Sequence, residues 1–307
     1  MSELNFQEGL VVENRDHAIF MEINFKSDDL DAIKDAISGL LARQRSYASR
    51  FDKCGLQIVV AFGRDAWTKL AGNDESATEL VDYTELGYGI GQATQRDMFV
   101  HINSHSHRIN FSVAQDLVKL FAGLITIEEE VHGFRWLEAR DLSGFVDGTE
   151  NPKGLKDRTE VAVINDGVDA GGSYVVAQKW VHSLEQIAHF TDKQKDDIFG
   201  RHRESDIEMA DDEKPVGAHT ERVVIDDENG DELEIVRHSL PYGYASGEKG
   251  LYFLAYSAEL TRFQKMLARM FGDEDGNFDH MFAYTHAITG SFLYVPSLDQ
   301  LDEIGAA

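Results

Sequence analysis

An aspartate, a histidine and an arginine in this chain stand where their neighbours would hold them in place. Asp147 lies in the run GFVDGTENP, where Asp-Gly favours a tight turn and Asn-Pro an extended exit. His219 lies between an acidic run and an apolar one, and Arg237 follows the alternating run 233–236. Peroxide cleavage needs a base that moves a proton between the two oxygens and a positive charge beside the developing negative charge. Asp147 and Arg237 could supply one each, with His219 as a metal ligand.

Each of these residues also has a simpler interpretation. Asp147 could merely close an Asx-turn, His219 could be an ordinary histidine among the twelve, and Arg237 could be a solvated arginine at a strand end. Neither HExxH nor a close Cys/His pair marks a zinc site. A single histidine suits haem, because the porphyrin supplies four nitrogens and the protein adds one imidazole. An arginine close to Asp147 should also lower the pKa of that carboxyl and keep it ionised.

The first half of the chain shows two β-α-β patterns in succession. Apolar periodicity predicts, in order, a strand over 19–25, a helix from a Ser27 cap to 41, strands over 56–62 and 98–102, a helix over 113–124 and a strand over 131–134. This order is typical of a ferredoxin-like unit.

The second half predicts a related α+β unit. Its elements are a strand over 174–181, helices opened by capping boxes at Ser183 and Thr191, strands over 223–225, 233–236 and 251–256, a helix over 260–271 that stops at Gly272, and a strand over 291–295. A chain of 307 residues favours about two domains, which we place at 1–143 and 144–307. The GFVDGTENP turn would then lie at the domain junction, where large ligand pockets commonly form.

The composition excludes several classes of partner. With 29 Lys and Arg against 55 Asp and Glu, the net charge of −26 would repel nucleic acid and anionic membranes. No run approaches the roughly 18 apolar residues of a membrane span, and no secretory leader is evident, so a cytoplasmic location is expected. Cys54 is the sole cysteine, and without CxxCH any haem would be bound non-covalently. His101, His105 and His107 are more typical of a polar strand end than of a metal site.

The segment at 144–148 matches the GxxDG motif of the dye-decolourising peroxidases, which the chain resembles almost end to end. Further matching blocks are AHTERV around His219, IVRHSLPYG around Arg237, GLYFLAY from 250 and TGSFLYVPS from 289. The resemblance implies non-covalent haem b, with His219 as the proximal iron ligand and Asp147 and Arg237 as the distal catalytic pair. The expected fold class is α+β, with two ferredoxin-like domains and antiparallel sheets of the dimeric α+β barrel type.

The resemblance also assigns further residues and partners. Ser239 would join the catalytic residues of the distal pocket, and Gly148, Thr149 and Phe253 would contact the cofactor. Asp279 aligns with the acid that accepts the second N–H of the proximal histidine, although a helix N-cap or loop acid is an equal alternative. The implied oxidant is hydrogen peroxide, the implied donors are small organic reductants such as dyes and phenols, and a homo-oligomer is expected.

Two other classes of function stay open beside the haem-dependent peroxidase. A haem-binding protein for storage, delivery or iron release would need His219 but not Asp147 and Arg237. A haem-free ferredoxin-like module that binds another ligand would need none of the three. A substitution of Arg237 separates the first two classes, and the absorption spectrum of protein reconstituted with haem separates the third.

Overall fold

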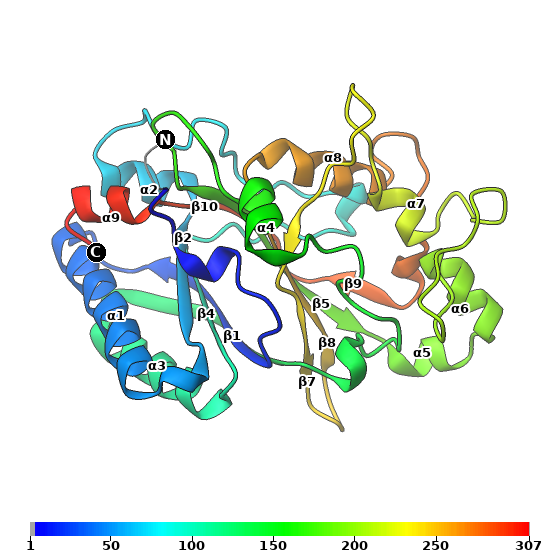
Figure 1. Cartoon of the computed structure of the whole chain (residues 1–307), viewed down its shortest axis with the longest axis horizontal. Helices are drawn as coiled ribbons and strands as arrows, with labels where there is room; N and C mark the ends of the chain where they lie inside the picture. The colour runs from blue at the N-terminus through cyan, green and yellow to red at the C-terminus, as the bar shows by residue number, and fades with distance from the viewer. Residues whose placement is uncertain (1–3, 307) are drawn as a thin grey trace.

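The computed structural model describes residues 4–306 and shows a sheet that is flanked by helices (Figure 1). Its strands are β1 (His17–Phe25), β2 (Gln57–Phe62), β3 (Met98–Ser104), β4 (Ile125–Phe134), β5 (Ser173–His182), β6 (Val236–Arg237), β7 (Leu240–Gly243), β8 (Lys249–Ser257), β9 (Thr285–Ala287) and β10 (Ser291–Val295). Its α-helices are α1 (Leu30–Arg50), α2 (Arg64–Ala71), α3 (His107–Leu120), α4 (Gly154–Ala162), α5 (Leu184–Ala188), α6 (Asp192–Phe199), α7 (His219–Val223), α8 (Leu260–Met270) and α9 (Leu298–Glu303).

The strands of each half follow the same antiparallel order. In the first half the order is β4-β1-β3-β2, and in the second half it is β10-β5-β8-β7, so both read fourth, first, third, second along the chain. This is the ferredoxin-like arrangement. The halves are joined by the pairs Tyr294↔Phe62 between β10 and β2 and Gly133↔Tyr242 between β4 and β7. In the described part of the chain these eight strands therefore close into one barrel, which confirms the predicted fold class.

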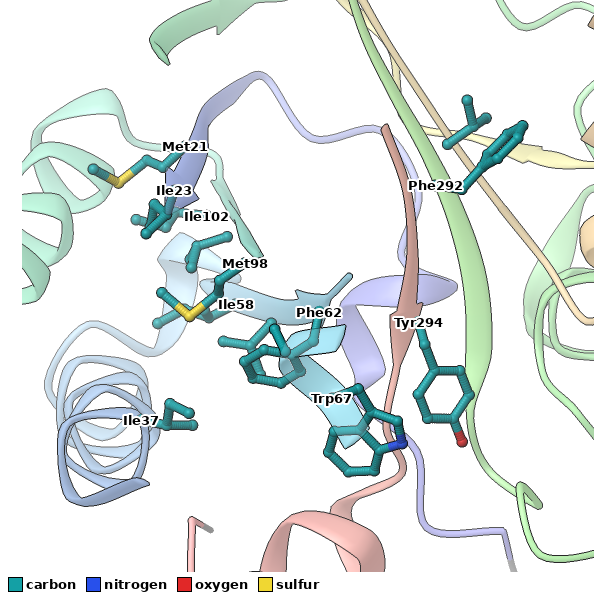
Figure 2. Close-up of a cluster of buried hydrophobic side chains, with 14 of the residues drawn as sticks. Met21, Ile23, Ile37, Ile58, Phe62, Trp67, Met98, Ile102, Phe292 and Tyr294 are labelled. Carbon is teal, nitrogen blue, oxygen red and sulfur yellow. The ribbon is translucent and has the colours of Figure 1, made fainter. Parts of the chain in front are cut away.

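Alternate side chains of each strand face opposite sides of the barrel wall. On β1, Phe20 joins a cluster inside the barrel, whereas Ile19 and Met21 join a cluster beneath the outer helices. Figure 2 shows part of this outer cluster, with Ile37 of α1 and Trp67 of α2 beside the strands. Figure 1 places α1 and α3 over one half and α7 and α8 over the other. The core thus has two parts, one inside the barrel and one between the barrel wall and the outer helices.

The structure corrects several details of the predicted elements. The predicted strand 223–225 is wrong, because α7 occupies His219–Val223. The β-branched residues of this segment favour a strand, but the contacts of Arg222 favour the helix. Arg222 is 1% exposed and donates to the carbonyl of Arg269 and to the carboxylate of Asp275. Of the predicted strand 233–236, only Val236 lies in a strand, which is β6 (Val236–Arg237).

The helix caps were predicted with mixed success. Asp29, not Ser27, caps α1 by accepting the backbone N–H of Ala32. Ser183 makes no capping bond, whereas Thr191 forms the predicted capping box with Gln194. Among residues 4–306, no helix is both long and apolar enough to cross a membrane.

Candidate active site

A large cavity lies on the outer face of the second half of the sheet. The outward residues of β5 and β8, among them Trp180 and Phe253, line one wall, and α8 residues such as Met266 line another. The cavity encloses about 1500 Å³, counting its open mouth. Every lining residue falls within 141–284. All of these residues except Asp141 therefore belong to the predicted domain 144–307.

His219 is the first residue of α7 and lines this cavity. Its Nδ1 lies 2.7 Å from Oδ2 of Asp279, a carboxylate that is 1% exposed. Because an ionised carboxylate can only accept, Nδ1 carries the proton and the Nε2 lone pair is left unused. The other oxygen of Asp279 accepts the backbone N–H of Met281 at 2.8 Å and caps a 3-10 helix. Asp279 thus both contacts the imidazole of His219 and caps a helix.

His182 is the second histidine on the cavity wall, and it differs from His219. Its Nδ1 lies 2.7 Å from Oγ1 of Thr285, and its Nε2 lies 3.1 Å from Oδ1 of Asp141. Both ring nitrogens of His182 are therefore engaged. Of the cavity-lining histidines in residues 4–306, His219 alone has a ring nitrogen available for a ligand.

Asp147 reaches the same cavity from the turn of the GxxDG motif. Gly144 (φ 95°) and Gly148 (φ 86°) adopt left-handed conformations that favour glycine. The backbone N–H of Asp147 donates to the carbonyl of Ala139 at 2.9 Å and fixes the turn. Burial raises the pKa of the Asp147 carboxyl above its ordinary value, and the positive charge of Arg237 offsets this only in part. The expectation that the arginine would lower this pKa was therefore wrong in its net direction, because desolvation outweighs the attraction.

Arg237 is held beside the same turn by its main chain. Asn151 donates to the carbonyl of Arg237 at 2.8 Å and accepts its N–H at 2.9 Å. This pair of bonds ties β6 to the segment that carries Asp147, so the two side chains share one cavity. The Nε atom of Arg237 is buried and has no hydrogen bond within residues 4–306. The role of Asn151 was missed because the sequence marks it only as the residue before Pro152.

The remaining predicted residues fall in two places. Gly148, Thr149 and Phe253 line the cavity with Asp147, and Thr149 donates to Asp206 at 2.6 Å. Ser239 instead lines a neighbouring cavity, and its Oγ accepts the backbone N–H of Leu254 at 3.2 Å. Arg201 and Glu150, which were not predicted as site residues, form a charged pair on the cavity wall. No motif marks that pair, because distant segments bring its members together.

Both halves of the chain match a family of known proteins. The family profile described as "Dyp-type peroxidase, N-terminal" matches residues 7–135, and "Dyp-type peroxidase, C-terminal" matches residues 138–300. The chain belongs to the Dyp-type peroxidase family. It is 37% identical to a dye-decolorizing peroxidase of Rhodococcus erythropolis over 291 residues, which cover 93% of this chain and 85% of that protein.

Solved structures show the same fold. A dye-decolorizing protein from V. cholerae has a TM-score of 0.91 at 34% identity, over 97% of this chain and 99% of that one. A DypB variant from Rhodococcus jostii, solved in complex with heme, has a TM-score of 0.90 at 29% identity, over 96% and 97% of the chains. This Dyp-type peroxidase is therefore a haem-dependent enzyme that uses hydrogen peroxide and a reductant.

The residues of the cavity fit haem. His219 offers one uncommitted imidazole nitrogen, which is what a porphyrin-bound iron requires from the protein. Apolar side chains from the sheet and from α8, such as Phe253 and Met266, could cover the faces of a flat macrocycle. The unpartnered Nε of Arg237 is a donor that lacks an acceptor in the protein itself.

Proposed function

We propose that His219 is the protein ligand of the haem iron and that Asp147 and Arg237 act on hydrogen peroxide in the same cavity. The observation that carries this proposal is the free Nε2 of His219 in a cavity that Asp147 and Arg237 also line. When bound, haem would supply a redox-active centre that gives two electrons to peroxide. Organic donors would then return these electrons one at a time.

The side chains of this chain have separate tasks in that reaction. Ionised Asp147 accepts the proton of the inner peroxide oxygen and returns it to the outer oxygen, which leaves as water. Arg237 stabilises the negative charge that develops as the oxygen–oxygen bond breaks. Asp279 positions the imidazole of His219 and increases its basicity. Gly148, Thr149 and Phe253 would contact the cofactor.

Further parts of the proposal concern partners and organisation. The haem is bound non-covalently as haem b. The donors include dyes, as the names of the relatives suggest, and phenols. Ser239 assists from the neighbouring cavity. We keep the division into domains 1–143 and 144–307, a homo-oligomeric assembly, and a cytoplasmic location in which neither nucleic acid nor membrane is a partner. The strongly negative net charge supports the proposal that neither nucleic acid nor an anionic membrane is a partner.

The pH dependence of the reaction tests the role of Asp147. Because Asp147 must be ionised, we expect the rate constant with peroxide to fall as the pH drops through its raised pKa, above the range of an ordinary aspartate. Asp147→Asn should lower the rate by about 10²-fold or more above that pKa and should remove the acid limb. Stopped-flow absorption across the acid pH range measures both effects. Asp157→Asn, at an exposed position on α4, is the control. An acid limb that persists in Asp147→Asn would contradict the proposal.

A second prediction concerns Asp279 as a positioning residue. Asp279→Asn removes the negative charge beside His219, so we expect the iron reduction potential to rise and the affinity for haem to fall by about 10–100-fold. Spectroelectrochemical titration and haem-transfer kinetics measure these quantities. Asp279→Glu should restore the potential in part, because it restores the charge. An unchanged potential in Asp279→Asn would mean that Asp279 serves only as a helix cap.

A further inference from the structure

A second cavity adjoins the first at one end of the barrel. It encloses about 1230 Å³, counting its open mouth, and shares Asp147, Gly148 and Arg237 with the haem cavity. Its other walls come from the segment before β1, the ends of β3 and β4, α4 and the start of β7. The turn that carries Asp147 thus faces two cavities. Beside the shared residues, the proposed function uses only Ser239 of the second cavity.

The charge of this second cavity is opposite to that of the whole chain. Its wall contains five arginines and one lysine, but only two acids: Arg15, Arg135, Arg140, Lys153, Arg158 and Arg237 against Glu13 and Asp147. The chain as a whole has a net charge of −26. Within residues 4–306, Arg140 pairs with Glu138, whereas the other four arginines have no carboxylate within ion-pairing distance. A surplus of unpaired positive charge here indicates an anionic ligand.

Arg158 is the most deeply buried of the arginines without an ion pair in this cavity. Its side chain is 3% exposed and donates to the carbonyls of Val11, Val12 and Pro152. Its guanidinium also contacts the ring of His238 at 3.0 Å. Burial lowers the pKa of Arg158, and burial holds the pKa of His238 well below its usual range, so that ring is neutral. Buried charges are normally paired. None of the hydrogen-bond partners of Arg158 is negatively charged, and the carboxylate of Glu13 acts on its guanidinium only from beyond ion-pairing distance.

Unsatisfied polar atoms occur in the same cavity. Asn103, on β3, is 1% exposed, and both Nδ2 and Oδ1 of its amide lack a hydrogen bond among the described residues. The Nε atoms of Arg15 and Arg237 are also buried without a partner. Most buried polar groups in proteins are hydrogen-bonded, so several orphans on one cavity wall point to a bound species. The arginines and Nδ2 require acceptors, and Oδ1 of Asn103 requires a donor.

We propose that the second cavity binds a hydrogen phosphate ion through Arg158, Arg15 and Asn103. Phosphate oxygens accept from guanidinium groups in the geometry that arginine favours. The hydroxyl of hydrogen phosphate can donate to Oδ1 of Asn103, which sulfate and a simple carboxylate cannot do. Phosphate binding at this site does not require haem. An absence of phosphate binding would therefore not contradict the proposed function.

Isothermal titration of the haem-loaded protein with inorganic phosphate at physiological ionic strength tests the proposal. We expect saturable binding of one phosphate per chain, with sulfate and succinate binding several-fold more weakly. Asn103→Leu removes no hydrogen bond that the structure contains, so it should fold normally and yet weaken phosphate binding by about tenfold or more. Arg158→Leu should abolish binding. Arg43→Leu, on α1 and not part of the cavity wall, should leave it unchanged.

Three results would overturn the proposal. The first is the absence of saturable phosphate binding in the wild-type protein. The second is equal affinity in wild-type and Asn103→Leu protein, with circular dichroism confirming that the variant is folded. The third is phosphate binding that occurs only in haem-free protein, because the arginines would then serve the carboxylates of the cofactor.

Discussion

His219→Ala protein is expected to purify without haem. The variant should retain less than about a tenth of the wild-type haem content, because the loss of even a supporting residue at a metal site weakens binding by about 10–100-fold and His219 is the ligand itself. The fold should persist, because the side chain of His219 makes one hydrogen bond, to Asp279. The Soret absorbance relative to that of the protein measures the haem content, and circular dichroism checks the fold.

A histidine outside the cavity provides the control for this experiment. His202 is exposed and pairs with Asp196 at 3.0 Å. His202→Ala should keep full haem content. If His219→Ala instead kept both its haem and the wild-type spectrum, another residue would have to bind the iron, and the proposed site would be wrong.

Arg237→Leu is expected to keep haem and lose peroxidase activity. The rate constant with hydrogen peroxide should fall by about 10²–10³-fold, the usual effect of removing one donor that stabilises developing negative charge. Asp147 should remain in place, because Asn151 bonds the backbone of residue 237 and not its side chain. Stopped-flow absorption gives the rate constant, and the spectrum of the resting protein reports bound haem.

The outcome for Arg237 also separates the two classes of haem protein. Arg43→Leu removes an exposed arginine from the other half of the molecule and should leave the rate unchanged. If Arg237→Leu protein reacted with peroxide at the wild-type rate, the arginine would have no part in the chemistry. Storage, delivery or iron release would then be the better account of this cavity.

Much of the fold could be predicted from local patterns. The predicted strand 174–181 lies within β5, and 291–295 coincides with β10, because both are short runs rich in β-branched and aromatic residues. The strand predicted over 223–225 is wrong. Its β-branched residues favour a strand locally, whereas the contacts of Arg222 with Arg269 and Asp275 stabilise a helix. The secondary structure of a segment cannot be predicted from its local residue preferences where contacts with residues distant in sequence determine it.

The sequence by itself determined which chemical groups are available: a carboxylate in a glycine-flanked turn, a histidine, an arginine and a strongly acidic composition. Only the tertiary structure decided how these groups behave. The Asn151 bonds bring Arg237 beside the turn of Asp147, the contact with Asp279 frees one nitrogen of His219, and burial raises the pKa of Asp147. Hydrogen bonding and desolvation depend on neighbours that are remote along the chain, so no local pattern records them.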